Sequence, residues 1–181
     1  ACRSVVGGFA RWIAGVDDES SYAKCIGGKS ELDLGIVIVP IPSAIRTEDV
    51  HQDVLSSPFF ESRVENAQRR ADKMEKAIRE GNLDEVGLFA EQDSLELHAL
   101  TMTGNNGIFI FTPESVKVIH LVRRLRKEGI KAYFSMQTGP SVFINTYPEN
   151  MNILEKEVRK IGLTTLTSRI GGPAKILNHK L

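Results

Sequence analysis

Residues 130–146, IKAYFSMQTGPSVFINT, decide the fold class of this chain. Apolar and polar residues alternate over 130–136 and again over 142–146, which predicts two strands that each bury one face. The sequence QTGPS at 137–141 is typical of a turn, because glycine and proline favour turn conformations. The pattern therefore predicts an antiparallel β-hairpin with a Gly-Pro tip.

Helical patterns surround this hairpin. Thr112-Pro113 is typical of a helix cap followed by proline at the first helical position, and an apolar stripe after Pro58 recurs at steps of three and four. Further helices are predicted over 47–56, with Thr47 as N-cap, after Gly81-Asn82 and from Pro148. Residues 5–12 have a helical spacing, and further strands are predicted over 34–40 and 163–170. Helices with partly hairpin-connected strands predict an α+β fold rather than a doubly wound sheet.

Charge and composition exclude several functions. The chain has 23 basic and 23 acidic residues, so it has no overall field that would attract nucleic acid or an anionic membrane. Its longest apolar run, Gly35 to Pro40, is far shorter than the roughly 20 residues of a spanning helix. The two cysteines match no metal-binding spacing and favour a reducing cytoplasm. We therefore expect a cytoplasmic protein with no nucleic-acid partner, no membrane partner and no metal ligands.

Three features are candidates for chemistry. The turn at 137–141 presents backbone amides and short polar side chains to a cleft, or is an ordinary hairpin turn. Arg3 lies beside an apolar segment with the pair Gly7-Gly8, where it binds a carboxylate or phosphate or lies at the surface. His98 is interpreted as a solvated or locally hydrogen-bonded side chain, or as a residue of a substrate pocket, since the spacing on its helix fits no standard metal motif.

Four segments together resemble one enzyme family. The sequence ACRS-x-x-GGF at 1–9 resembles a motif of the mevalonate diphosphate decarboxylases, which belong to the GHMP kinase superfamily. SPFF at 57–60, ELHA at 96–99 and YFSMQTGPS at 133–141 are similar to further segments of that family, in the same order. The resemblance implies a GHMP-kinase-type carboxy-terminal domain, in which an antiparallel sheet packs with helices.

The resemblance also implies a domain organisation. Residues 31–181 correspond to the carboxy-terminal domain, and residues 1–30 to the tail end of the amino-terminal kinase-like domain. The phosphate-cradling loop of the family belongs to an amino-terminal half outside this chain, and the sequence contains no G-x-x-x-x-G-K-[ST] or G-x-G-x-x-G motif. ATP and Mg²⁺ are therefore expected to bind mainly to that half, in a homodimeric protein.

The family reaction places roles on individual residues. A mevalonate-pathway decarboxylase phosphorylates the 3-hydroxyl of a phosphorylated mevalonate with ATP, then releases phosphate and CO₂ to form isopentenyl phosphate or diphosphate. Arg3 matches the arginine that clamps the substrate carboxylate, and Gln137 stands where the family has an aspartate. These two are the predicted catalytic residues. The predicted substrate-binding residues are Arg46, Thr47, Val50, His98, Thr138, Gly139 and Ser141.

Gln137 leaves the reaction type open. An amide can orient a hydroxyl but cannot accept its proton near neutral pH. Archaeal-type relatives include a mevalonate 3-kinase that stops after phosphorylation and an ATP-independent mevalonate 3,5-bisphosphate decarboxylase, and DVHQDV at 49–54 resembles these relatives more closely. A non-catalytic subunit of the same fold is the remaining alternative.

Overall fold

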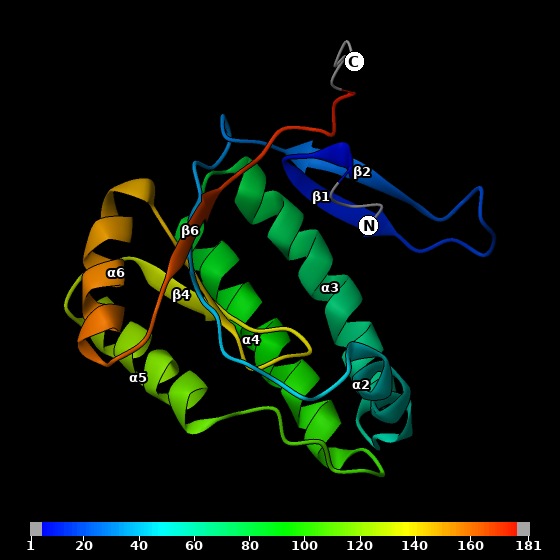
Figure 1. Cartoon of the computed structure of the whole chain (residues 1–181). Helices are drawn as coiled ribbons and strands as arrows, with labels where there is room; N and C mark the ends of the chain where they lie inside the picture. Colours follow the sequence, from blue (N-terminus) through cyan, green and yellow to red (C-terminus); the bar gives the residue numbers. More distant parts are fainter. Residues whose placement is uncertain (1–4, 177–181) are drawn as a thin grey trace, which may run out of the picture.

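The computed structural model of the chain describes residues 5–176, and its centre is a four-stranded antiparallel sheet (Figure 1). The strand order is β4-β5-β3-β6, so β3 lies inside the sheet although it is the first of the four along the chain. The bounds are Gly35–Val39 for β3, Ala132–Ser135 for β4, Val142–Thr146 for β5 and Leu166–Arg169 for β6. The predicted hairpin is confirmed as β4 and β5, in which Phe134 pairs with Ile144.

Helices cover both faces of this sheet, which confirms the predicted α+β class (Figure 1). The helices are α2 (Thr47–Asp53), α3 (Phe60–Arg79), α4 (Leu83–Thr103), α5 (Pro113–Lys127) and α6 (Met151–Lys160), with 3₁₀ turns η1 (Val54–Ser56) and η2 (Pro148–Asn150). α5 and α6 pack on one face, and the antiparallel pair of α3 and α4 packs on the other. No helix within residues 5–176 combines the length and apolar character needed to cross a membrane.

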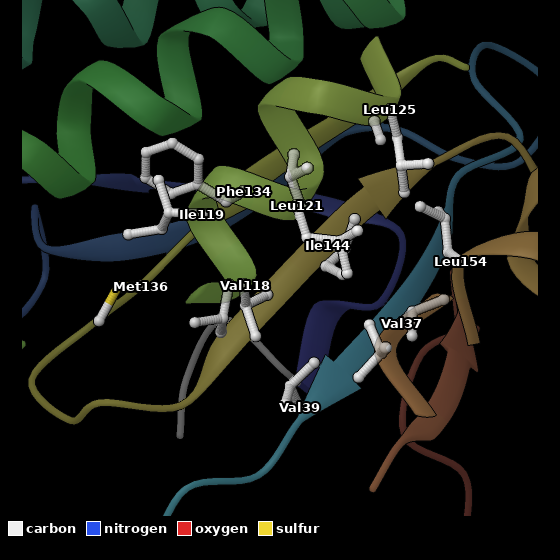
Figure 2. Packing of buried hydrophobic residues seen from close by; sticks show 14 residues of the cluster. Val37, Val39, Val118, Ile119, Leu121, Leu125, Phe134, Met136, Ile144 and Leu154 are labelled. Carbon is white, nitrogen blue, oxygen red and sulfur yellow. The ribbon is translucent and has the colours of Figure 1, made fainter. Parts of the chain in front are cut away.

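The main core lies between the sheet and α5 and α6 (Figure 2). Val37 of β3, Phe134 of β4 and Ile144 of β5 are fully buried and point to the same face of the sheet. Val118 of α5 and Leu154 of α6 pack against them. Each such side chain contributes about 1.5–3 kcal/mol by leaving water. The period-2 pattern that predicts the hairpin therefore also defines the buried face.

The leading segment differs from its prediction. The helical spacing predicted over 5–12 is confirmed only at Val5 and Val6, and it is wrong for the rest, because Phe9–Ile13 forms strand β1 and pairs antiparallel with β2 (Tyr22–Gly27). Gly7 and Gly8 have φ values of +73° and +61°, in the left-handed region that a right-handed helix excludes. The domain boundary predicted near residue 30 stays a prediction.

One side of α3 also differs from its predicted apolar stripe. Val64, a residue of the predicted stripe, is 54 % exposed, whereas Arg70 is buried. The Arg70 guanidinium forms ion pairs with the carboxylates of Asp93, at 2.8 Å, and Glu96 on α4. A buried charge is tolerated when it is paired and hydrogen-bonded. Helix-to-helix packing here therefore includes a charged contact that the hydrophobic pattern does not reveal.

Gly87 allows α4 to approach β4 closely. A Cβ atom at this position would lie 2.0 Å from Cγ of Tyr133. The Tyr133 ring is buried, and its hydroxyl donates a hydrogen bond to Oδ1 of Asp84 at 2.7 Å, so the ring has little room to withdraw. This glycine is therefore required by packing and not by a turn.

We expect Gly87→Ala to lower the free energy of unfolding by about 1–3 kcal/mol, as overpacking does. In an unobstructed helix interior the same change would instead stabilise by about 0.5–1 kcal/mol. Denaturant unfolding measures the difference. The control is Gly172→Ala, whose added Cβ meets no atom within 4 Å. A Gly87→Ala protein as stable as the wild type would contradict the prediction.

Candidate active site

The turn at 137–141 joins β4 to β5 and is attached to the segment that leads from β3 into α2. The hydroxyl of Ser141 accepts a hydrogen bond from the backbone N–H of Ile41 at 3.0 Å and donates to the Ile41 carbonyl at 3.3 Å. The hydroxyls of Thr138 and Thr47 form a hydrogen bond at 3.0 Å. The structure thus brings three of the predicted substrate-binding residues, Thr47, Thr138 and Ser141, together around this turn.

Arg46 and Thr47 lie at the start of α2, and Thr47 joins it to the turn through Thr138. A helix N-cap was predicted at Thr47, and this is wrong: Arg46 holds the cap position, with no capping hydrogen bond from its side chain. The Arg46 guanidinium is largely exposed and pairs with Glu48 at 2.8 Å. Exposed ion pairs contribute little to stability, typically about 0–1 kcal/mol. The guanidinium can therefore exchange Glu48 for an anionic ligand at small cost.

Gln137 lines a cavity of about 450 Å³ between β1, α3, α4 and the end of β4. Its walls include Trp12 of β1, Met74 of α3 and Ser94 of α4. Residues near the start of the chain and the hairpin turn therefore face the same cavity. Arg3 lies outside the described residues, so its predicted place beside Gln137 stays a prediction.

A polar row on α4 binds the outer edge of β4. Oε1 of Glu91 accepts a hydrogen bond from the Phe134 N–H at 3.1 Å, and the Ser94 hydroxyl accepts one from the Met136 N–H at 2.9 Å. Arg126 of α5 in turn donates to both Glu91 oxygens, at 2.8 and 3.2 Å. These bonds satisfy backbone groups that an edge strand otherwise leaves unpaired.

This row was not predicted, because the apolar residues that follow Gly81-Asn82 indicate one buried stripe and give no sign of a second buried face. Glu91, Ser94 and His98 are spaced by three and four residues, so they share one face of the helix. That face packs on β4, while the apolar stripe containing Val86 packs with α3. The helical spacing of these three polar residues was the feature of the sequence that could have predicted a second buried face.

His98 is enclosed in the protein, with 1 % of its surface exposed, so the solvated alternative is wrong. The centre of its ring lies 4.5 Å from that of Phe111. Burial lowers the pKa of His98 to about 4, and the neighbouring backbone of Gln137 acts in the opposite direction. Among the described residues, neither ring nitrogen has a hydrogen-bond partner of ordinary geometry. The imidazole is therefore neutral near neutral pH.

The two remaining predicted residues lie in contrasting places. Val50 is fully buried and packs with Leu100 and Ile110 below α2, so its side chain has no exposed surface for a substrate contact. Gly139 lies in the turn, where an added Cβ would meet no atom within 4 Å. Gly139 is open to a ligand, whereas Val50 supports α2 from inside.

A glycine-rich surface near β2 does not fit a nucleotide phosphate. The Gly28 N–H donates to the Glu31 carboxylate at 2.6 Å, and the Gly8 N–H donates to the Gly171 carbonyl at 2.9 Å. These amides are already bonded, and the carboxylate would repel a phosphate. Within residues 5–176, no group of three or more His, Cys, Asp or Glu side chains is arranged to hold a metal ion.

The antiparallel sheet, the helix layers and the turn beside the cavity are those of a carboxy-terminal domain of the GHMP kinase superfamily. Over residues 43–169 the sequence matches the family described as the mevalonate 5-diphosphate decarboxylase C-terminal domain. The chain belongs to this family.

Individual relatives agree with this assignment. Phosphomevalonate decarboxylase of Haloferax volcanii is 36 % identical over 180 residues, which cover 99 % of this chain and 56 % of the relative. Mevalonate 3,5-bisphosphate decarboxylase of Thermoplasma acidophilum is 24 % identical, over 82 % of this chain and 36 % of the relative. A solved structure of the mevalonate diphosphate decarboxylase from Enterococcus faecalis is 27 % identical, with a TM-score of 0.86 over 95 % of this chain and 54 % of that one. The chain spans about half the length of the first of these relatives, and the matches also include a mevalonate-3-kinase.

Proposed function

We propose that this chain is part of a mevalonate-pathway decarboxylase that acts on mevalonate 5-phosphate. The observation that carries the proposal is the 36 % identity to a phosphomevalonate decarboxylase along nearly the entire chain. The reaction converts mevalonate 5-phosphate and ATP into isopentenyl phosphate, ADP, phosphate and CO₂. The enzyme is proposed to be a cytoplasmic homodimer.

In this proposal two side chains act on the reacting end of the substrate. Arg3 binds the carboxylate through a two-pronged hydrogen bond and orients the C–C bond that breaks. The amide oxygen of Gln137 accepts a hydrogen bond from the 3-hydroxyl and orients it without removing its proton. The rest of the substrate is proposed to bind at the turn and the start of α2, to Arg46, Thr47, Thr138, Gly139 and Ser141.

ATP and Mg²⁺ supply the phosphoryl group and neutralise its charge. The glycine-rich surface of the described residues does not fit this group, as its amides are occupied. We propose that the nucleotide binds to the portion of the relatives' length that this chain does not cover. The residues of this chain then bind the acceptor, orient its hydroxyl and hold its carboxylate.

A second candidate is a mevalonate 3-kinase that stops after phosphorylation. Gln137 favours it, because phosphoryl transfer depends mainly on positioning and charge neutralisation, whereas the amide brings no negative charge to the decarboxylation step. A mevalonate-3-kinase is also among the relatives.

One set of incubations separates these candidates. The full-length protein is given mevalonate, its 5-phosphate, its 5-diphosphate or its 3,5-bisphosphate, each with and without ATP, while CO₂ and ADP are followed. CO₂ and ADP from the 5-phosphate with ATP would support the proposed decarboxylase. ADP without CO₂ would support the kinase, and CO₂ from the bisphosphate without ATP would identify an ATP-independent decarboxylase. No product from any substrate would reject catalysis.

We expect Gln137→Asp to raise the rate of CO₂ release at least about 10-fold, because a carboxylate can accept the hydroxyl proton and stabilise positive charge. The measurement is the initial rate of CO₂ release relative to ADP formation. Gln137→Asn is the matched control, since it has the shape of aspartate without its charge, and it should give no increase. Equal rates in the Asp and Asn variants would show that this position does not face the reacting carbon.

A further inference from the structure

Side chains on successive turns of α4 accept hydrogen bonds from the backbone at the end of β4 and just after it. Glu91 binds the Phe134 N–H, and Ser94, one helical turn later, binds the Met136 N–H. Beyond Met136 the strand has ended and the chain enters the turn that begins with Gln137. The next position on the same face of α4, four residues after Ser94, is His98.

His98 is buried beside an aromatic ring and the backbone of Gln137. Phe111 packs against its ring, and its exposed fraction is 1 %. The Gln137 backbone is a polar neighbour of the ring and favours its protonated form, as a carbonyl does. Among the described residues neither ring nitrogen has a hydrogen-bond partner of ordinary geometry, and a buried polar group without one is unfavourable. A small shift of the ring or of the turn that completes a bond to this backbone would therefore be favourable.

We propose that His98 is a positioning residue for Gln137: it completes the row begun by Glu91 and Ser94 by donating a ring N–H to the Gln137 carbonyl. The proposal rests on the proposed function, in which the Gln137 amide orients the 3-hydroxyl. A direct contact between His98 and substrate is not required.

The geometry of the turn explains why this contact matters. On its other side the turn is hydrogen-bonded to residues 41–47, which lead into α2, through the Thr138–Thr47 and Ser141–Ile41 hydrogen bonds. On the side of α4, the Ser94 bond ends at Met136. In this proposal the His98 bond orients the peptide that follows Gln137 on that side. A displacement of about 1 Å at a reacting group can lower a rate about 100-fold.

The test uses the full-length protein with His98→Phe, which keeps the ring and its packing but has no donor, and His98→Asn, which restores a donor. We expect His98→Phe to lower kcat about 10- to 100-fold with KM changed by less than about twofold, and His98→Asn to recover most of the loss. Thr101→Val is the matched control. Thr101 is buried on the same helix and bonds only the His98 carbonyl among the described residues, at 2.9 Å, so kcat should stay within about twofold.

A second readout does not depend on activity. Gln137-Thr138 is the only Gln-Thr pair in the sequence, so glutamine labelled with ¹³C at the carbonyl and threonine labelled with ¹⁵N mark the peptide in question. Loss of its NMR signal in Gln137→Asn identifies the resonance. The Gln137 carbonyl resonance should move in His98→Phe, return toward its wild-type position in His98→Asn and stay unchanged in Thr101→Val.

Each result of these two measurements either supports the role of His98 or overturns it. An unmoved carbonyl resonance in a folded His98→Phe protein would overturn the proposal, as would wild-type kcat in that variant or failure of His98→Asn to recover. If His98→Phe does not fold, His98→Leu against His98→Asn makes the same comparison. If the wild type forms neither CO₂ nor ADP, the proposed function fails, and the carbonyl resonance alone still decides whether His98 holds the Gln137 peptide.

Discussion

Replacing Arg3 with lysine in the full-length protein is expected to lower kcat about 100-fold or more, because an ammonium group cannot reproduce the planar two-pronged contact with a carboxylate. A misaligned carboxylate leaves the breaking C–C bond outside the reactive geometry. The expectation rests on the proposed role of Arg3, which the resemblance of residues 1–9 to the family motif implies. Steady-state rates of CO₂ and ADP formation measure it.

The matched control is Arg159→Lys. Arg159 lies on α6 in an exposed ion pair with Glu155, at 3.1 Å, and is not part of the cavity that contains Gln137. This variant should keep kcat within about twofold of the wild type, as exposed substitutions usually do. An Arg3→Lys protein that keeps wild-type kcat would reject the carboxylate-binding role of Arg3.

Removal of the Glu91 carboxylate is expected to lower the free energy of unfolding by about 3–5 kcal/mol, the effect of breaking a buried ion pair on one side. Glu91 is 7 % exposed and accepts hydrogen bonds from Arg126 and from the Phe134 N–H. Glu91→Ala therefore leaves the Phe134 N–H without its acceptor and the Arg126 guanidinium without its carboxylate partner, although the guanidinium keeps its bond to the Ala132 carbonyl at 3.2 Å. Denaturant unfolding measures the change.

A double-mutant cycle identifies how much of this loss belongs to the ion pair. Glu91→Ala combined with Arg126→Ala should be less destabilising than the sum of the single changes, with a coupling of about 1–3 kcal/mol. Lys131→Ala is the control for Arg126→Ala, because its pair with Asp84 is exposed and should contribute at most about 1 kcal/mol. Strict additivity of the Glu91 and Arg126 changes would contradict the pairing.

The sequence predicted several elements of the site, such as the turn, but not how they contact one another. The turn at 137–141 was recognisable because Gly-Pro between two alternating segments leaves few other conformations. Its attachment to Ile41 and Thr47 was not, because these hydrogen bonds join residues about 100 positions apart that only the sheet brings together. The burial of His98 was missed for a similar reason, since α4 packs on two neighbours and only one of its faces was apolar.

The leading strand shows a different limit. Val5, Phe9 and Trp12 fit one continuous helix as well as they fit a helix that ends at Val6 and is followed by a strand, and a short apolar pattern does not distinguish the two. The choice was made by pairing of β1 with β2 and by the left-handed backbone at Gly7 and Gly8. A two-stranded pairing depends on its partner, which local preference does not reveal.

By itself the amino-acid sequence determined the hairpin, the α+β class, the main helices and the family, because alternation, capping residues and helix-ending glycines act over a few neighbouring residues. Only the tertiary structure decided the strand order β4-β5-β3-β6, the cavity shared by β1 and Gln137, and the polar row of α4 along β4. These features depend on contacts between segments far apart in the chain, and such contacts form only when burial and hydrogen bonding across the whole domain are satisfied together.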